Sequence, residues 1–341
     1  MPALPPHAPP RGPRPSPSAQ SNFLSVTIAI TGAAGNLGSL LAQRMTGREG
    51  VLLRLMVHHK GLPAHAQDLP NATVFKADLA KPDTLVPVLQ GADVVVHFAG
   101  ILFKHNPEKF LPTTNTGYFR NLVDVAVEQE VKRIILISFP HVEGESTPEK
   151  PATGHLNGEP SSVHARTRLA EEKYLFEMAD RHGFEGVSLR VGMVYGKGIL
   201  MIEGARWFAK HRLLGVWEKP THIHLISTID YLEANAQAAL KPNISGIYHI
   251  GDEGVQTLQE FLDICCLTWG YKKPWRMPPW LIFTAASIFE AWSWLFGTRA
   301  PLTRDFIRIG MASYYGDTSR MRKELLPELK YKIVQEGRAS L

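Results

Sequence analysis

The chain has 341 residues, of which 44% are hydrophobic and 20% charged, an ordinary globular mixture that suggests one large domain or two closely joined ones. This composition excludes a wholly disordered chain, a fibrous repeat and a polytopic membrane protein. The excess of 37 Lys and Arg over 32 Asp and Glu is too small for this length to indicate a nucleic-acid partner. Adjacent Cys265 and Cys266 predict neither a disulfide framework nor a metal site, but part of a buried helix face.

The N-terminal segment differs from the rest of the chain. Residues 1–20 hold eight prolines, and no Asp or Glu occurs before Glu49. Such a segment cannot bury enough apolar surface to fold, and it lacks the apolar stretch of a secretory signal. We therefore predict a disordered proline-rich arm over residues 1–22 and a cytoplasmic protein. A translation start placed too early would give the same pattern.

Strands that alternate with helices are predicted from residue 25 to about residue 198. The strands are expected at 25–31, 51–57, 73–75, 92–98, 133–138 and 187–190, and the helices at 39–45, 82–89, 114–130 and 163–183. This alternation predicts an α/β fold with a doubly wound parallel sheet covered on both faces. Later helices are expected at 203–211, 231–240 and 257–269, with one more strand at 246–251.

A glycine-rich loop joins the first strand to the first helix. Its spacing is Gly32-x-x-Gly35-x-x-Gly38. The first glycine allows a tight turn, the second lets the backbone approach a pyrophosphate, and the third lets helix and strand pack closely. The helix N-terminus adds unpaired N–H groups and a partial positive charge. The loop therefore predicts a Rossmann-type dinucleotide-binding domain over residues 23–198, to which some later segments return, and a smaller, mostly helical C-terminal substrate region over 199–341.

The end of the second strand indicates which dinucleotide binds. An acidic residue there would bind the ribose 2′-hydroxyl of NAD, and basic residues would accept a 2′-phosphate. No Asp or Glu occurs from Val51 through Gln67, whereas Arg54, His58, His59 and Lys60 do. The sequence thus favours NADP(H) over NAD(H), unless these side chains are only solvated surface cations.

Five short motifs give the chain a resemblance to a known family. They are Thr31-Gly-Ala-Ala-Gly-Asn-Leu-Gly38, Ala77-Asp78-Leu79, Phe98-Ala99-Gly100, Asn115-Thr-Gly117 and Val194-Tyr-Gly196. Because these motifs occur in this order, the chain resembles the extended short-chain dehydrogenase/reductases. This is the NAD-dependent epimerase/dehydratase group, which includes nucleotide-sugar epimerases and 3β-hydroxysteroid dehydrogenase-like enzymes. The resemblance runs from about Val26 to about Leu325.

The resemblance implies a set of cofactor-binding residues. Asp78 would contact the adenine, and Val191 and Met193 would lie near the nicotinamide. The full expected set is Gly32, Ala34, Gly35, Asn36, Leu37, Gly38, His58, His59, Lys60, Asp78, Leu79, Phe98, Ala99, Gly100, Arg168, Val191 and Met193.

The family's catalytic residues do not carry over. A serine after the fifth strand and a Tyr-x-x-x-Lys pair on the next helix are expected, and Phe139, His164 and Arg168 stand in their places. Phenylalanine cannot hydrogen-bond a carbonyl, whereas histidine can transfer protons near neutral pH. His164 is therefore a candidate acid/base and Arg168 a candidate ribose ligand. The alternative is that His164 packs in a cleft whose chemistry was lost.

Polar residues on the following loop form a second candidate set. His141 and Glu143 follow the fifth strand, at the edge where this fold binds its ligands. With His155 and Glu159 they could form an acid/base set for a different reaction. For His155 and Glu159 we favour simple solvation, and for His141 and Glu143 both interpretations stay open.

A long apolar run over residues 279–296 is rich in aromatic side chains. Glu290, Ser287 and Ser293 interrupt it, which disfavours a membrane-spanning helix. A helix packed over the substrate cleft is the plain interpretation. The alternative is an interfacial helix that makes peripheral contact with a membrane, flanked by Lys272, Lys273, Arg276 and Arg299.

Together these features predict an NADP(H)-binding, epimerase/dehydratase-type oxidoreductase. It would act on a lipophilic or sugar-derived carbonyl or alcohol, with the atypical acid/base His164. The alternative function is a catalytically inactive dinucleotide-binding scaffold, assembly factor or redox sensor. An oligomer and a place at the membrane surface are compatible with both.

Overall fold

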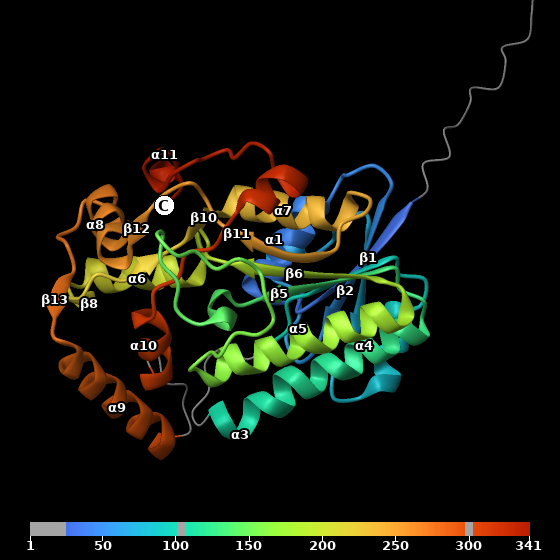
Figure 1. Cartoon of the computed structure of the whole chain (residues 1–341), viewed down its shortest axis with the longest axis horizontal. Coiled ribbons are helices and arrows are strands. Elements are labelled where there is room, and N and C mark those ends of the chain that lie inside the picture. The colour runs from blue at the N-terminus through green and yellow to red at the C-terminus, as the bar shows by residue number, and fades with distance from the viewer. Residues whose placement is uncertain (1–24, 101–106, 297–302) are drawn as a thin grey trace, which may run out of the picture.

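The computed structural model of the chain describes residues 25–100, 107–296 and 303–341. The arm predicted at 1–22 and Arg299 lie outside these residues. Within them, seven parallel strands form one sheet in the order β11-β6-β5-β4-β1-β2-β3 (Figure 1). The strands are β1 Val26–Thr31, β2 Val51–Val57, β3 Ala72–Lys76, β4 Val94–His97, β5 Arg133–Ser138, β6 Glu185–Val191 and β11 Gly246–Ile250. The α/β fold with a Rossmann-type doubly wound sheet is confirmed.

Helices cover both faces of this sheet. One face carries α1 (Asn36–Met45) and α7 (Thr228–Leu240), and the other carries α2 (Val86–Leu89), α4 (Tyr118–Glu128) and α5 (Val163–His182). Because side chains alternate along a strand, Ile28 and Ile30 of β1 join the core beneath α1 while Ala29 joins the core beneath α4. Buried β-branched and aliphatic side chains on both faces explain the continuous apolar runs of the central strands.

Two predicted helices differ from expectation in their internal geometry. Residues 82–89 form a 3₁₀ turn, Pro82–Thr84, followed by the short α2, because Pro87 has no N–H with which to continue a hydrogen-bond ladder. The helix expected at 114–130 begins as a π-helical stretch, Pro112–Gly117, before α4, and it follows α3, Pro107–Leu111.

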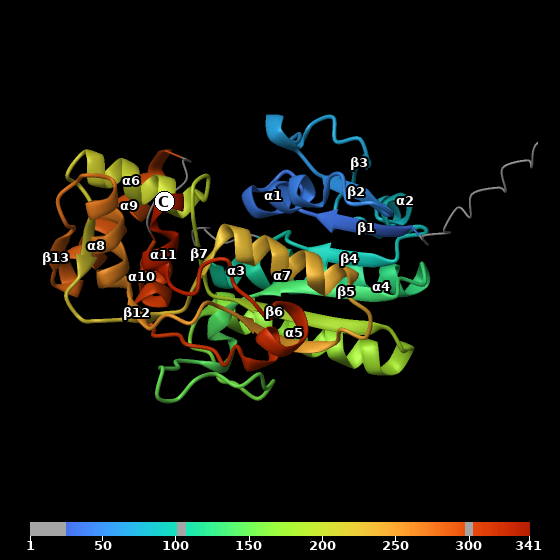
Figure 2. The ribbon, with the colours of Figure 1, turned by 90° about the horizontal axis from the view of Figure 1, so that it is seen from above.

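A second group of elements lies beyond the carboxyl ends of the central strands (Figure 2). Its helices are α6 Leu200–Lys210, α8 Leu258–Thr268, α9 Pro279–Phe296, α10 Arg304–Met311 and α11 Val334–Gly337. Its short strands pair as β7 Met193–Tyr195 with β10 Leu225–Ser227, β9 His222–Ile223 with β12 Gln256–Thr257, and β8 Gly215–Trp217 with β13 Trp275–Met277. We call this group the C-terminal lobe.

The lobe contains the features that the sequence singled out late in the chain. Cys265 and Cys266 are both free and buried on α8, as predicted. In the described part of the chain, no helix combines the length and the hydrophobicity needed to cross a bilayer.

A buried ion pair fixes α5 on the sheet. Glu172 of α5 and Arg190 of β6 are fully buried, and the Arg190 guanidinium donates to both carboxylate oxygens, the shortest contact being 2.6 Å. The hydroxyls of Ser138 and Ser188 donate to the same carboxylate. A buried charge without its partner is costly, so this pair sets how α5 is turned against β5 and β6.

The substitution Glu172→Gln should destabilise the protein by on the order of 3 kcal/mol, because it leaves the buried Arg190 guanidinium short of a negative charge. The free energy of unfolding in urea measures this loss. Glu177→Gln is the matched control, because Glu177 lies on the same helix and pairs with Arg181 at the surface. It should change the free energy by about 0.5 kcal/mol or less. Equal effects of the two substitutions would contradict the role of Glu172.

Candidate functional site

The glycine loop between β1 and α1 is packed against the chain that follows β4. Gly32 has a φ of +71°, and a Cβ atom there would lie 2.9 Å from the backbone nitrogen of Ala99. A Cβ atom on Gly38 would lie 2.5 Å from the carbonyl oxygen of Gly32. These distances leave no room for side chains, so the loop brings bare backbone to the carboxyl edge of the sheet.

The first turn of α1 keeps its N–H groups free of side-chain caps. The N-cap residue, Gly35, has no side chain with which to cap the helix, and no acidic residue occurs in the first turn. The Asn36 side chain instead reaches the lobe, donating to the carbonyl of Gly198 and accepting from the N–H of Leu200. Unpaired N–H groups at a helix N-terminus attract an anion, so this cradle fits a dinucleotide pyrophosphate.

The basic residues after β2 lie at the surface beside the end of β3. His58, His59 and Lys60 are exposed, and His58 Nε2 lies 3.6 Å from a carboxylate oxygen of Asp78. Arg54 does not lie with these three residues, because its guanidinium donates to the carbonyl of Pro87 in α2. The structure thus separates Arg54 from the three residues that the sequence grouped with it.

Beneath the glycine loop, Thr31 of β1 and His97 of β4 form a hydrogen-bonded pair. His97 Nδ1 lies 2.8 Å from the Thr31 hydroxyl, and burial together with the charge of Arg168 lowers the pKa of His97 to about 3. His97 is therefore neutral in the folded protein. His97 was not among the residues expected from the sequence, although its place at the end of a buried strand could have indicated it.

Arg168 reaches across the carboxyl end of β4. A Cβ atom on Gly100 would lie 2.4 Å from one guanidinium nitrogen of Arg168, so the missing side chain at position 100 makes the room that this nitrogen occupies. Asn115 is buried nearby. Arg168 therefore lies at the edge where the sequence analysis expected a ribose ligand.

Arg168 is paired with a buried acid on its own helix. Its guanidinium donates to Glu171 at 2.5 Å, and Glu171 is fully buried. Burial raises the pKa of Glu171, while the charge of Arg168 opposes that rise. Glu171 was not among the residues expected from the sequence. Its position three residues after Arg168, which is the spacing of neighbours on one helix face, could have indicated it.

The aromatic rings of Phe139, His141 and His164 lie together at the end of β5. The Phe139 and His164 ring centroids are 4.6 Å apart, and those of Phe139 and His141 are 5.2 Å apart. His164 is 2% exposed, and its Nδ1 atom has no hydrogen-bond partner. Burial, with the nearby charge of Arg168, lowers the pKa of His164 to about 3. His164 is therefore shielded from solvent beside Phe139, and its imidazole is neutral.

His141 is held by the lobe. Its Nε2 atom lies 3.0 Å from the carbonyl oxygen of Ala312, just after α10, and burial lowers its pKa. A cavity of about 160 Å³ lies beside His141. Its lining comes from the start of α5, the loop after β5 and α10, and includes Ser162, Val163, Asp305 and Arg308.

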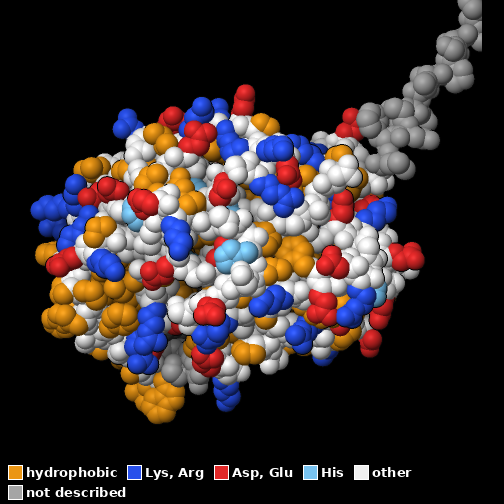
Figure 3. Space-filling view, viewed as in Figure 1, with side chains coloured by type: hydrophobic (Ala, Val, Ile, Leu, Met, Phe, Trp, Pro, Cys, Tyr) orange, Lys and Arg blue, Asp and Glu red, His pale blue; other side chains and the backbone are white. Residues whose placement is uncertain are grey.

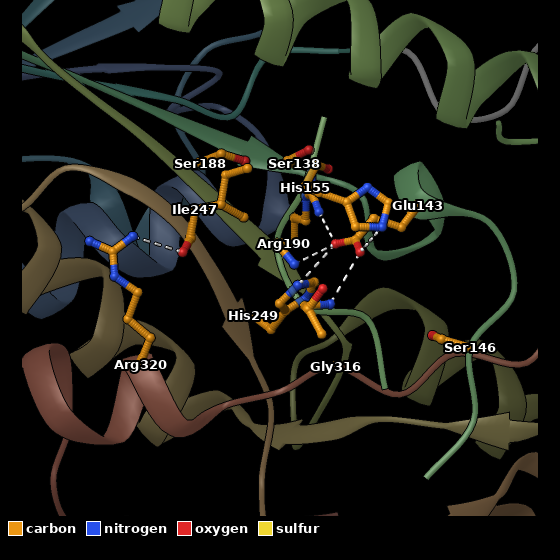
Figure 4. A network of polar contacts seen from close by, with 12 residues as sticks. Ser138, Glu143, Ser146, His155, Ser188, Arg190, Ile247, His249, Gly316 and Arg320 are labelled. Atoms are coloured by element: carbon orange, nitrogen blue, oxygen red, sulfur yellow. Dashed lines mark hydrogen bonds and ion pairs between the residues drawn. The ribbon is translucent and has the colours of Figure 1, made fainter. Parts of the chain in front are cut away.

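Glu143 belongs to a separate polar network (Figure 4). It contacts Arg190, its carboxylate lies 2.9 Å from His155 and 3.2 Å from His249, and it accepts the backbone N–H groups of Thr153 and Gly154. Burial alone would raise the pKa of Glu143, but contact with His249 and the charge of Arg190 outweigh it and lower the pKa to about 2. The Glu143 carboxylate thus connects residues 153–155 of the following loop to Arg190 of β6 and His249 of β11.

The four polar residues that the sequence proposed as one acid/base set are therefore divided. His141 lies with Phe139 and His164, Glu143 and His155 lie in the network around Arg190, and Glu159 is exposed. The sequence could not show this division, because all four residues belong to one stretch of loop.

Val191 and Met193 lie at the carboxyl end of β6, on either side of a tight crossing. Between them, Gly192 passes so close to the lobe that a Cβ atom would lie 2.1 Å from the carbonyl oxygen of His224. The Met193 N–H donates to the same carbonyl at 2.7 Å. This crossing joins the sheet to the lobe beside the expected nicotinamide position.

Comparisons with known proteins agree with this geometry. A model of the "NAD dependent epimerase/dehydratase family" matches residues 28–214, more than half of the chain. A uronate dehydrogenase of Pseudomonas putida is 32% identical over 165 residues, which are 48% of this chain and 60% of that protein. A UDP-glucose 4-epimerase of Vibrio cholerae is 28% identical over 51% of this chain and 53% of its own length. The chain thus matches little more than half the length of these two relatives.

A solved structure extends the likeness in fold. The UDP-glucuronic acid 4-epimerase of Bacillus cereus, solved in complex with UDP-glucuronic acid and NAD, superposes with a TM-score of 0.73. The superposition covers 92% of this chain and 97% of that one, at 19% identity. The family match, supported by the seven-stranded sheet and its glycine loop, shows that this chain belongs to the NAD-dependent epimerase/dehydratase family.

Proposed function

We propose that this protein is an NADP(H)-dependent oxidoreductase of the epimerase/dehydratase type, acting on a carbonyl or alcohol of a sugar-derived or lipophilic substrate. One observation supports the proposal most. The glycine cradle at α1, Arg168 and the ring cluster around His164 all face the carboxyl edge of the same sheet. In open α/β sheets that edge is where ligands bind. The lobe beyond it is the proposed substrate-binding region.

The preference for NADP(H) rests on the charge at the end of β2. His58, His59 and Lys60 are exposed there, and among the described residues Asp78 supplies the one carboxylate in contact with them. A 2′-phosphate carries negative charge that these side chains would accept, whereas the 2′-hydroxyl of NAD(H) calls for a carboxylate in their place. Lys60, the lysine of this exposed segment, is the most direct test of the preference.

His164 is the proposed proton-transfer residue, and it acts from its neutral form. The chemistry supplied by a bound nicotinamide is the acceptance or donation of hydride at carbon. In the direction of alcohol oxidation, His164 takes the hydroxyl proton on an unpaired ring nitrogen, and Nδ1 is such an atom. In the reverse direction the ring would return that proton to the oxygen that hydride addition leaves negatively charged, so that the imidazole ends neutral again.

Arg168 and Glu171 form the proposed support for the nicotinamide ribose. An arginine presents several N–H donors in a fixed plane, and Glu171 occupies one of them. The other terminal nitrogen, Nη2, lies beside Gly100, at the edge where the ribose would lie. Glu171 is then a positioning residue, because it acts through Arg168.

A second candidate function is a dinucleotide-binding scaffold, assembly factor or redox sensor without catalysis. The observation in its favour is the burial of His164, which is 2% exposed and packed edge-on against Phe139, where the family's pattern has a serine. The two functions differ in whether hydride moves to or from a substrate. The expected oligomer and the expected membrane contact of residues 279–296 stay predictions under both.

We expect the purified protein to bind NADPH more tightly than NADH. The substitution Lys60→Ala should weaken NADPH binding about tenfold or more, because a charge-assisted contact to the 2′-phosphate is lost, and leave NADH binding unchanged. Titration of cofactor fluorescence measures both affinities. Lys173→Ala, which changes an exposed lysine on α5, is the control and should alter neither. Equal affinities for the two dinucleotides, unaffected by Lys60→Ala, would contradict the preference.

The substitution His164→Asn should reduce kcat/KM for alcohol oxidation by about 100- to 10,000-fold while NADP⁺ still binds. Oxidation by the unchanged protein should stay level from about pH 8 to about pH 5, because a pKa lowered to about 3 keeps the base neutral there. A histidine of ordinary pKa would lose half its activity near pH 6.5. His182→Asn, on the exposed end of the same helix, is the control.

The same assay separates the two candidate functions. Sugars, uronic acids and lipophilic secondary alcohols labelled with deuterium at the carbinol carbon are offered with NADP⁺. Deuterium in the recovered NADPH supports the oxidoreductase. Tight binding of NADPH without transfer from any substrate class favours the scaffold, and failure to bind either dinucleotide overturns both.

A further inference from the structure

Helix α9 has an outward face without charge. Its inward positions are Ile282, Ala286 and Ser293, which are buried. Its single acidic residue, Glu290, is half-buried and pairs with Arg304 of α10 at 2.7 Å. The outward positions are Trp280, Leu281, Thr284, Ser287, Ile288, Phe289, Ala291, Trp292, Trp294, Leu295 and Phe296.

This surface is unusual for a helix that faces water. Such a helix normally has a charged or strongly polar outer face, whereas a helix that is apolar all round is buried in protein or in lipid. The outer face of α9 is neither polar nor covered by the rest of the described chain. Trp294 is 74% exposed and Trp280 is 67% exposed. These are large apolar side chains held in solvent.

The apolar surface extends onto neighbouring elements. Trp275 of β13 is exposed, and its indole N–H donates to the carbonyl of Arg212 just after α6. Trp207 and Phe208 of α6 and Leu213 are also exposed. Figure 3 shows hydrophobic side chains gathered at the end of the molecule where α9 lies. We call α9, together with Trp207, Phe208, Leu213 and Trp275, the aromatic surface.

Cations accompany the aromatic surface. Arg206, Lys210, Arg212 and Lys272 are exposed and, among the described residues, have no carboxylate partner. The nearby acid, Asp263, is already paired with Lys273 and Arg276. The exposed acids Glu203 of α6 and Glu218 after β8 offset part of this charge, and the four unpaired cations leave the aromatic surface with a net positive rim.

We propose that the aromatic surface docks on an anionic phospholipid bilayer, with α9 lying in the plane of the interface. Tryptophan is suited to this position, because its ring is apolar and its N–H reaches the headgroups. The unpaired cations match negatively charged headgroups. No described helix can span a bilayer, so the helix lies on the membrane rather than across it.

A second copy of the chain is the competing occupant. A closed, two-fold contact would place the same surface of both copies face to face. The positive rims around Arg206 and Lys272 would then repel each other, whereas an anionic bilayer complements them. Charge therefore favours lipid over self-association.

The test is co-sedimentation of the full chain with vesicles of phosphatidylcholine that contain phosphatidylglycerol, beside vesicles of phosphatidylcholine alone. We expect tighter binding to the anionic vesicles and quenching of tryptophan fluorescence by brominated lipid. The double substitution Trp292→Ser/Trp294→Ser should weaken binding about tenfold for each indole removed. Lys210→Gln/Lys272→Gln should weaken binding to anionic vesicles only.

The control is Val74→Ser/Val255→Ser, which removes exposed apolar side chains away from this surface and should leave binding unchanged. Thermal unfolding of each variant checks that the fold is intact. Absence of vesicle binding, or equal binding by the tryptophan double variant, would overturn the proposal. Self-association at low micromolar concentration that Trp292→Ser/Trp294→Ser abolishes, without vesicle binding, would assign the surface to a second copy instead.

Discussion

The buried pair of Glu172 and Arg190 is the constraint on which the site depends. His164, Arg168 and Glu172 follow each other at intervals of four residues, so they lie along one face of α5. When Arg190 holds Glu172 against β6, the same rotation of the helix turns Arg168 toward Gly100 and His164 toward Phe139. Arg190 also contacts Glu143, so the loop after β5 is held by the same charge. One ion pair thus positions the helix and the loop together.

The residues at the expected catalytic positions have buried or apolar surroundings. The guanidinium of Arg168 reaches the sheet edge, and Glu171 lies buried against it. Phe139 forms an apolar wall beside His164. A neutral imidazole is the form of histidine that such surroundings favour, because burial penalises the charged form.

The two ends of the molecule differ in how far their apolar side chains are covered. Around the sheet, apolar side chains are covered on both faces by helices. In the lobe, α9 buries only a narrow stripe and leaves tryptophans in solvent. So much exposed apolar area at one end of the molecule supports the proposal of a partner there.

The sequence by itself determined the alternation of strands and helices and the glycine loop after the first strand, since periodicity and glycine spacing are local properties. Only the tertiary structure decided which polar residues meet. Glu143 joins Arg190 and His249 rather than His141, because its partners come from β6 and β11, far along the chain. The contact of His97 with Thr31 of β1 and the exposure of α9 emerged for the same reason. Local patterns fix an element's type, whereas burial and partners depend on contacts between distant segments.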